Sequence, residues 1–263
     1  MKKLLLFVFV ALAMVSPSNC FADIASGVSG TCTWSISDDG TLTVQPKSGS
    51  DGTLGSWEKQ TETPWHEYCQ NIKNAVFKGK VLAKTCCGLL FSCNNMTRVD
   101  LSGLDTKNVT DMSWMFGDCW CLESLDVSKL NTSNVTNMNA MFAKCQDLET
   151  LDVSKFNTSK VTNMNKMFYE LLSLQSLNVR NFDTRNVTDM GLMFALCSRI
   201  QSLDLSKFNT SKVTDMSGLV NACERLTSID LSSFDTRNVT NMMAMFCLCE
   251  SLTSIDLSKF NTS

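Results

Sequence analysis

The chain has 263 residues, of which 44% are hydrophobic, and carries a formal net charge of −3 at pH 7. This length is enough to bury one extended core. Nucleic acid is excluded as a partner, because the sequence has no basic run that could neutralise phosphates and release their counterions.

The first 22 residues have the composition of an export signal. Lys2 precedes an apolar run from Leu4 to Val15, and a small-residue pattern ends at Ala22. About 12 apolar residues are too few to cross a hydrocarbon core of roughly 30 Å, which disfavours a membrane anchor. Lipid attachment at Cys20 is also disfavoured, since Pro-Ser-Asn precedes it. We therefore predict a signal peptide over 1–22 and an exported, not membrane-spanning protein, secreted or at the cell surface, with the periplasm left open as a location.

Residues 23–75 differ in kind from the rest of the chain. Two segments of alternating polarity, 33–37 and 41–44, flank Asp38-Asp39-Gly40. This pattern is typical of a β-hairpin. We predict a β-rich N-terminal cap over 23–75, because a repeat array needs a cover over its open end.

Residues 76–263 form a tandem array of a 26-residue unit. After a degenerate first coil, six full copies and a partial seventh follow without insertion or deletion, and they begin at Met96, Leu122, Leu148, Leu174, Ile200, Leu226 and Leu252. Self-similarity at a fixed short period indicates a solenoid, in which each unit buries its apolar face only against its neighbours.

The spacing of apolar residues changes within each unit. Leu122, Leu125 and Val127 are spaced like a short strand with one buried face. A second group has the i, i+3, i+4, i+7 spacing of a short helix: Met138, Met141, Phe142 and Cys145. Thr136 precedes this stripe as a helix N-cap.

Two solenoid classes accommodate a unit of about this length, the leucine-rich repeat and the parallel β-helix. Only the leucine-rich repeat explains the helical stripe. The sequence therefore predicts an α/β fold, a right-handed leucine-rich-repeat solenoid (horseshoe) with a parallel sheet on one face and short helices on the other.

The chain contains 13 cysteines. Six of them occupy one position of the repeat: Cys93, Cys119, Cys145, Cys197, Cys223 and Cys249. Leu171 fills this position in the remaining copy, which a buried apolar site permits and a zinc site does not. We expect reduced core thiols there and no metal, while Cys32 and Cys69, both in the cap of an exported chain, are candidates for a disulfide.

The sequence shows no catalytic constellation. His66 is the one histidine of the chain, and no serine or cysteine lies at a motif spacing from it. The methionines of the helical stripe are interpreted as core residues. We therefore predict that the protein is not an enzyme and uses no cofactor.

One exposed row of the predicted sheet carries carboxylates, and it is our hypothesis for a ligand-binding surface: Asp100, Asp126, Asp152, Asp204, Asp230 and Asp256. Stacked strands would place neighbouring carboxylates about 4.8 Å apart, where like charges repel. Serine hydroxyls and the nearby lysines Lys129 and Lys155 could offset this repulsion within the protein. The alternatives are a cationic partner surface or calcium, and a flat row lacks the converging oxygens that calcium takes.

The segment LDVSKFNTSKVTNMNKMF, residues 151–168, closely resembles the repeat of the BspA-like family of leucine-rich-repeat bacterial surface proteins. The match continues through residues 96–263, and the cap also resembles the segment that precedes repeats in that family. The resemblance implies a leucine-rich-repeat horseshoe, display at the cell surface and a part in adhesion and host interaction, with no catalytic residues.

These observations lead us to expect a secreted or surface-displayed binding scaffold whose strand face contacts a protein or glycan ligand. The alternative is a structural envelope component that associates end to end through its repeats.

Overall fold

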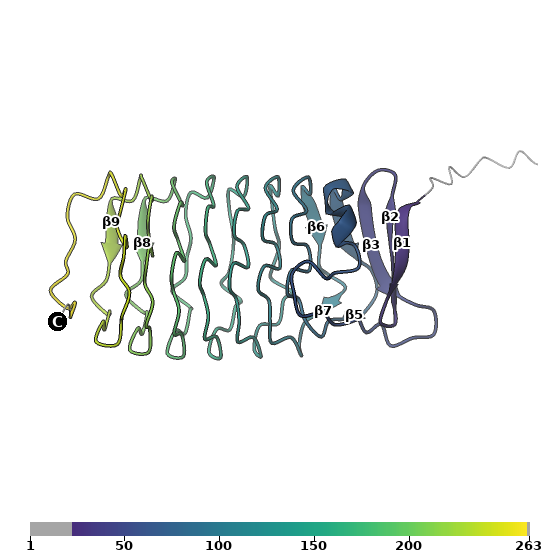
Figure 1. Cartoon of the computed structure of the whole chain (residues 1–263), viewed down its shortest axis with the longest axis horizontal. Coiled ribbons are helices and arrows are strands. Elements are labelled where there is room, and N and C mark those ends of the chain that lie inside the picture. Colours follow the sequence, from purple (N-terminus) through teal and green to yellow (C-terminus); the bar gives the residue numbers. More distant parts are fainter. Residues whose placement is uncertain (1–22, 262–263) are drawn as a thin grey trace, which may run out of the picture.

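The computed structural model describes residues 23–261 of the chain, and the predicted signal peptide lies outside them. Figure 1 shows a cap at the N-terminal end followed by coils stacked side by side in a row. The named elements are β1 (Asp23–Ser29), β2 (Cys32–Ser37), β3 (Thr41–Pro46), the 3-10 helix η1 (His66–Asn71), β4 (Asn74–Phe77), β5 (Val81–Leu82), β6 (Arg98–Asp100), β7 (Leu104–Asp105), β8 (Ser202–Asp204) and β9 (Ser228–Asp230).

The predicted hairpin is confirmed as β2 and β3, which pair antiparallel. In its turn, an Asp39 carboxylate oxygen accepts hydrogen bonds from the Ser37 hydroxyl and the Thr41 N–H. Gly40 has a φ of 84°, and a Cβ there would lie 2.6 Å from the carbonyl oxygen of Asn71. Only glycine fits this position, because it accepts positive φ and leaves room for the neighbouring backbone.

The cap and the first coils share one sheet, with strand order β1-β2-β3-β4-β6. β3 pairs parallel with β4, and β4 pairs parallel with β6, so the antiparallel cap continues into the parallel stack. Trp65 is fully buried at this junction, and its Nε1 donates to the carbonyl of Leu89 at 2.8 Å. The antiparallel strands of the cap therefore cover the N-terminal end of the array, with the buried Trp65 packed beneath them. A solenoid needs such a cover to keep the apolar face of its first coil from water.

The predicted helices are wrong. Among residues 23–261 the structure contains no α-helix, and the segment from Met138 to Cys145 forms consecutive turns. Ala140 and Lys144 have φ values of 52° and 62°, which an α-helix excludes. The equivalent pairs in other coils also have positive φ: Gly88 and Ser92, Trp114 and Asp118, Lys166 and Glu170, Leu192 and Leu196, Gly218 and Ala222, Ala244 and Leu248.

Hydrogen bonding between coils explains why the turns replace a helix. The N–H groups of Met138, Ala140, Phe142 and Lys144 donate to carbonyls of the next coil, the last of them to Tyr169 at 2.7 Å. The alternate N–H groups make local i to i−3 bonds, such as that from Met141 to Met138 at 3.3 Å. Every second main-chain donor thus leaves its own segment, which no helix allows. The apolar stripe is nevertheless buried, because the turns point the same side chains inward.

Thr136 is not a helix N-cap. Its N–H and its hydroxyl both donate to the carbonyl of Thr110 in the preceding coil, at 2.8 and 3.2 Å. The equivalent threonines repeat this arrangement: Thr162, Thr188, Thr214 and Thr240.

The strand face carries less main-chain pairing than predicted. Its paired strands are β6, next to the cap, and β8 with β9 near the other end. Between them, the corresponding residues 124–126, 150–152 and 176–178 form no paired strand. The continuous parallel pairing lies instead at the start of the turns, as single bridges along Asp111, Asn137, Asn163, Asp189, Asp215 and Asn241. The turn side therefore holds the middle coils together.

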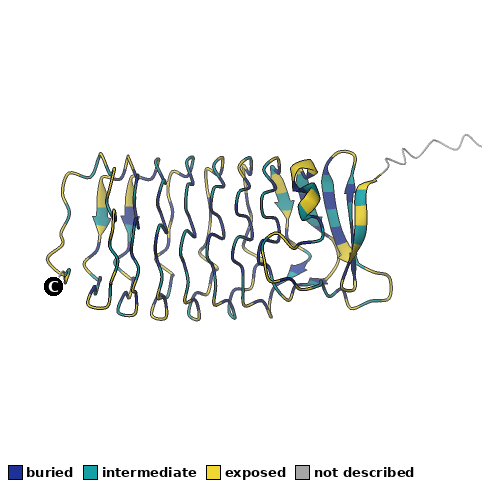
Figure 2. Ribbon diagram, in the orientation of Figure 1, coloured by how far each residue is buried: buried dark blue, intermediate teal, exposed yellow. Residues whose placement is uncertain are grey.

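The core is a stack of identical side chains. Phe116, Phe142, Phe168 and Phe194 lie on one another with ring centroids 5.6 to 5.8 Å apart. Figure 2 shows buried residues along the middle coils and mostly exposed residues in the final one. In the last full coil, which begins at Leu226, Met243 is 73% exposed, because no further turn segment covers it within the described residues.

Candidate functional site

The carboxylates of the predicted ligand row are part of a repeated turn. In each case Oδ1 accepts the N–H of the residue two positions later, for example Asp152 from Ser154 at 2.9 Å. The same bond occurs at Asp100, Asp126, Asp204, Asp230 and Asp256. Asn178 makes it with Arg180 at 3.1 Å, so an uncharged side chain also supports the turn.

These hydrogen bonds favour the charged form of each carboxylate. Bonds from the serine two residues later hold the pKa of Asp126, Asp152 and Asp230 below its usual range. The same is true of Asp100, Asp204 and Asp256. Neighbouring carboxylates oppose the shift, since Asp126 raises the pKa of Asp152 and Asp204 raises that of Asp230.

Basic side chains relieve part of this repulsion. The hydrogen bonds from serine have the largest effect on these pKa values. Lys129 also lowers the pKa of Asp126, and Lys155 lowers that of Asp152. Arg180 forms an ion pair with Asp204 of the next coil. The row is therefore stabilised within the protein, while the carboxylates of Asp126, Asp152 and Asp230 remain exposed to solvent.

The strand face is hollowed from the coil that begins at Leu174 to the coil that begins at Leu252. Three open depressions of about 630, 270 and 380 Å³ lie there. The first and second share Ser176 and Ser202, and the second and third share Ser202 and Asp204. They form one elongated polar surface, which we call the strand-face groove. Three of the predicted carboxylates line it, namely Asp204, Asp230 and Asp256.

Sequence reasoning did not single out the basic end of this groove. Its largest depression is lined by Gln175, Ser176, Arg199, Gln201, Ser202 and Arg225. Both arginines stand at the repeat position just before the first apolar residue of a coil, where other coils have Asn95, Cys121, Asp147, Ser173 and Ser251. Variation at an exposed position, against an otherwise constant repeat, is the signal that could have identified them.

An acidic hollow of about 410 Å³ lies on the same edge, two coils nearer the cap. Glu123, Asp147 and Glu149 line it. This edge therefore changes from negative to positive along the array.

The cap cysteines are separate from the strand-face groove. Cys32 and Cys69 are both buried, and both are free thiols in this structure. The Cys32 Sγ donates to the carbonyl of Gly52 at 3.1 Å, and burial raises the pKa of this thiol to about 11. The disulfide between Cys32 and Cys69 stays a prediction.

Five of the six repeat cysteines are buried, and Cys249 in the last full coil is partly exposed. The Cys145 Sγ donates to the carbonyl of Phe116 in the preceding coil at 3.2 Å. Cys119, Cys197, Cys223 and Cys249 make the same kind of bond. Burial raises the pKa of Cys197 to about 12, and it also raises the pKa of the other repeat thiols, which keeps them neutral near pH 7. The repeat cysteines therefore pack in or against the core and do not line the strand-face groove.

Over residues 23–261, no group of three or more His, Cys, Asp or Glu side chains is placed to hold a metal ion. Across the same range, no helix is long and apolar enough to cross a membrane. His66 packs in the cap, with its ring stacked 6.0 Å from that of Phe91.

Comparison with known proteins identifies one family. Residues 85–203 and 173–263 match a family model described as "Mycoplasma protein of unknown function, DUF285". No curated protein matches the chain.

Two solved structures are similar over most of their length. A leucine-rich repeat protein from Eubacterium ventriosum is 16% identical over 90% of this chain and 92% of its own, with a TM-score of 0.33. A leucine rich cell surface protein from Faecalibacterium prausnitzii is 14% identical over 89% of this chain and 96% of its own, with a TM-score of 0.26. TM-scores of this size are too low to assign a shared fold.

Proposed function

The chain belongs to the DUF285 family, whose description assigns no activity, and we propose that it is an exported, non-enzymatic binding scaffold. Its strand-face groove contacts a protein or glycan ligand outside the cell. The resemblance of its repeats to BspA-like surface proteins supports a place at the cell surface and a part in adhesion.

The strand-face groove is the observation that carries this proposal. Three connected depressions run across successive coils, and most of the side chains along them are polar and exposed. An elongated surface with many hydrogen-bonding groups fits an extended ligand, because successive coils offer the same groups at a regular spacing. It does not fit a small apolar molecule, which needs a concave apolar pocket.

The rigidity of the groove also supports binding. Each carboxylate is held by its own turn, and the coils are joined by main-chain bonds on the opposite side. Groups that are ordered before binding lose little side-chain entropy when the ligand arrives.

An array of glycans and extracellular-matrix proteins tests the proposal. The parent protein is compared with a variant carrying Asp204→Asn and Asp230→Asn. Asn178 already supports the same turn, and the solvent-accessible Arg180–Asp204 ion pair that the variant loses contributes little to stability, so we expect the variant to fold and to melt close to the temperature of the parent. Binding should weaken by roughly tenfold for each lost charge-assisted hydrogen bond.

Asp183→Asn with Asp235→Asn serves as the matched control, since these carboxylates pair with Arg185 and Arg237 of their own coils. This control removes the same charge away from the groove and should retain binding. Equal binding by the parent and the groove variant to every ligand found would contradict the strand-face groove as the contact surface.

A further inference from the structure

Within residues 23–261, the arginines at the basic end of the strand-face groove form no ion pair with an acidic side chain. Arg199 and Arg225 are exposed, and neither forms a hydrogen bond or an ion pair within the described part of the chain. In contrast, Arg180, Arg185 and Arg237 all pair with aspartates. Two unpaired guanidinium groups in one depression indicate a site for an anionic group.

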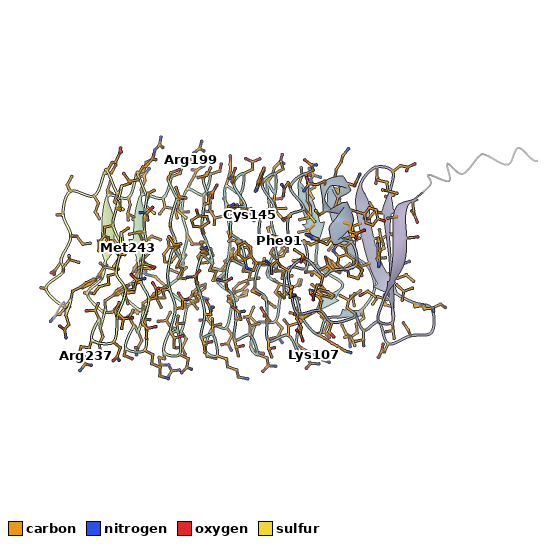
Figure 3. The ribbon with its side chains drawn as sticks, viewed as in Figure 1. Phe91, Lys107, Cys145, Arg199, Arg237 and Met243 are labelled. Carbon is orange, nitrogen blue, oxygen red and sulfur yellow. The ribbon has the colours of Figure 1, made fainter. Side chains whose placement is uncertain are left out.

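The two arginines occupy the same position of consecutive coils, 26 residues apart in the sequence. Coils joined by parallel pairing are separated by about 4.8 Å. β8 and β9 follow the two arginines and pair parallel, so the main chains at Arg199 and Arg225 are neighbours, and both long side chains can reach one carboxylate placed between them. Figure 3 shows Arg199 at one long edge of the array, whereas Lys107 and Arg237 lie at the opposite edge.

The remaining lining residues favour a ligand rich in hydroxyl groups. Gln175 and Gln201 supply amide donors and acceptors, and Ser176 and Ser202 supply hydroxyls. A depression of about 630 Å³ lies within the range of pockets that hold a small molecule, and the polar lining disfavours an apolar one.

The acidic part of the groove restricts the ligand further. Asp204, Asp230 and Asp256 line the depression on the other side of Ser202 from the arginines. These carboxylates would repel a glycan that carries a negative charge on every sugar. Neutral sugar hydroxyls can instead donate to these carboxylates. The complementary ligand is therefore anionic at one end and neutral along the rest.

We infer that the strand-face groove binds a glycan whose terminal sugar carries a carboxylate, with that carboxylate between Arg199 and Arg225 and the neutral sugars over Asp204 and Asp230. The inference rests on the proposed function and adds the chemical class of the ligand. Gln175 and Gln201 contact the hydroxyls of the acidic sugar.

Titration calorimetry with three matched sugars tests this inference: sialyllactose, its methyl ester at the carboxylate, and lactose. The parent protein should bind sialyllactose at least about tenfold more tightly than the ester or lactose, because each lost charge-assisted bond costs about that factor. This preference should decrease at high salt.

The Arg199→Gln, Arg225→Gln variant should bind the three sugars alike and melt at the temperature of the parent, since both side chains are exposed. Arg185→Gln with Arg237→Gln changes the net charge equally at the opposite edge and should keep the preference. The single variants Arg199→Gln and Arg225→Gln repeat the measurement with a smaller perturbation of folding.

Equal affinity of the parent for all three sugars would overturn the carboxylate site and leave the scaffold in place. A preference that survives in the Arg199→Gln, Arg225→Gln variant would also overturn it. If the parent binds none of these sugars but the arginine variant loses self-association in sedimentation, the arginines contact the acidic hollow of a second copy and the inference is wrong. Failure of every ligand on the array would instead contradict the proposed function.

Discussion

Thr158 holds both main-chain groups of Asp183 in the next coil. Its hydroxyl oxygen accepts the Asp183 N–H at 2.7 Å and its hydroxyl donates to the Asp183 carbonyl at 3.1 Å. The side chain is 1% exposed, so water cannot replace either bond. The same relationship recurs at Thr106, Thr132, Thr184, Thr210 and Thr236.

Thr158→Val should therefore destabilise the array by about 1–3 kcal/mol, because it leaves a buried N–H and a buried carbonyl without this partner. Thr162→Val is the matched control. Thr162 is exposed and makes one hydroxyl bond, to Thr136, so its loss should cost less than about 1 kcal/mol. Urea unfolding followed by circular dichroism measures both, and equal costs would contradict the structural role of the buried threonines.

Lys166→Gly distinguishes turns from helices by the sign of its effect. Lys166 has a φ of 57°, and glycine already occupies the equivalent position as Gly218. A non-glycine residue in the left-handed region costs about 1–2 kcal/mol, part of which glycine recovers despite its greater chain entropy. The variant should be as stable as the parent or more stable by up to about 1 kcal/mol.

In a helix the same substitution would cost about 1 kcal/mol. Ser198→Gly is the control, because Ser198 has no positive φ and should gain nothing. A clear loss of stability in Lys166→Gly, together with a strong helical signal in far-ultraviolet circular dichroism, would contradict the turn structure.

Cys145→Ala should destabilise the protein by about 1–2 kcal/mol, mainly through the small void that it leaves in the stack. The carbonyl of Phe116 keeps a second donor, the N–H of Cys119, so the lost thiol bond adds little. Cys247 is exposed, and Cys247→Ala should have no effect beyond measurement error. Thiol labelling of the native protein should accordingly modify Cys247 rapidly and Cys145 only on unfolding.

Stability should decrease as the pH rises above the ordinary thiol pKa of 9.0. Burial raises the pKa of Cys197 to about 12 and that of Cys119 well above its usual value, so the folded state keeps neutral thiols. The unfolded chain loses these protons first, and ionisation of its thiols then favours unfolding. Stabilisation by the buried thiols is thus complete below pH 9.0 and is lost as the pH rises through the folded-state values.

Urea midpoints under reducing conditions, measured from neutral pH to about pH 10, show this loss. The variant Cys197→Leu removes one titrating thiol. Leucine is compatible with this repeat position, because Leu171 occupies it in the preceding coil. The stability of the variant should fall less steeply with pH than that of the parent. Identical pH profiles for the two proteins would exclude buried thiols as the cause.

The sequence alone did not predict the acidic hollow or the basic end of the groove, because each is formed by side chains from two or more stacked coils. The sequence showed Asp147, Arg199 and Arg225 at one repeat position, but the surrounding depressions involve side chains from neighbouring coils. Their common edge appears only once the coils are stacked.

The sequence by itself determined the repeated unit, the buried positions and the hairpin around Gly40. Apolar residues at fixed spacings leave few ways to bury them, and Asp-Asp-Gly between alternating segments has one common solution. The conformation between Met138 and Cys145 was decided by the tertiary structure, because i, i+3, i+4, i+7 spacing is compatible with more than one inward-facing backbone. Hydrogen bonds to the next coil, such as that from Phe142 to Met167 at 3.1 Å, exist only in the stack and favour the turns over the helix.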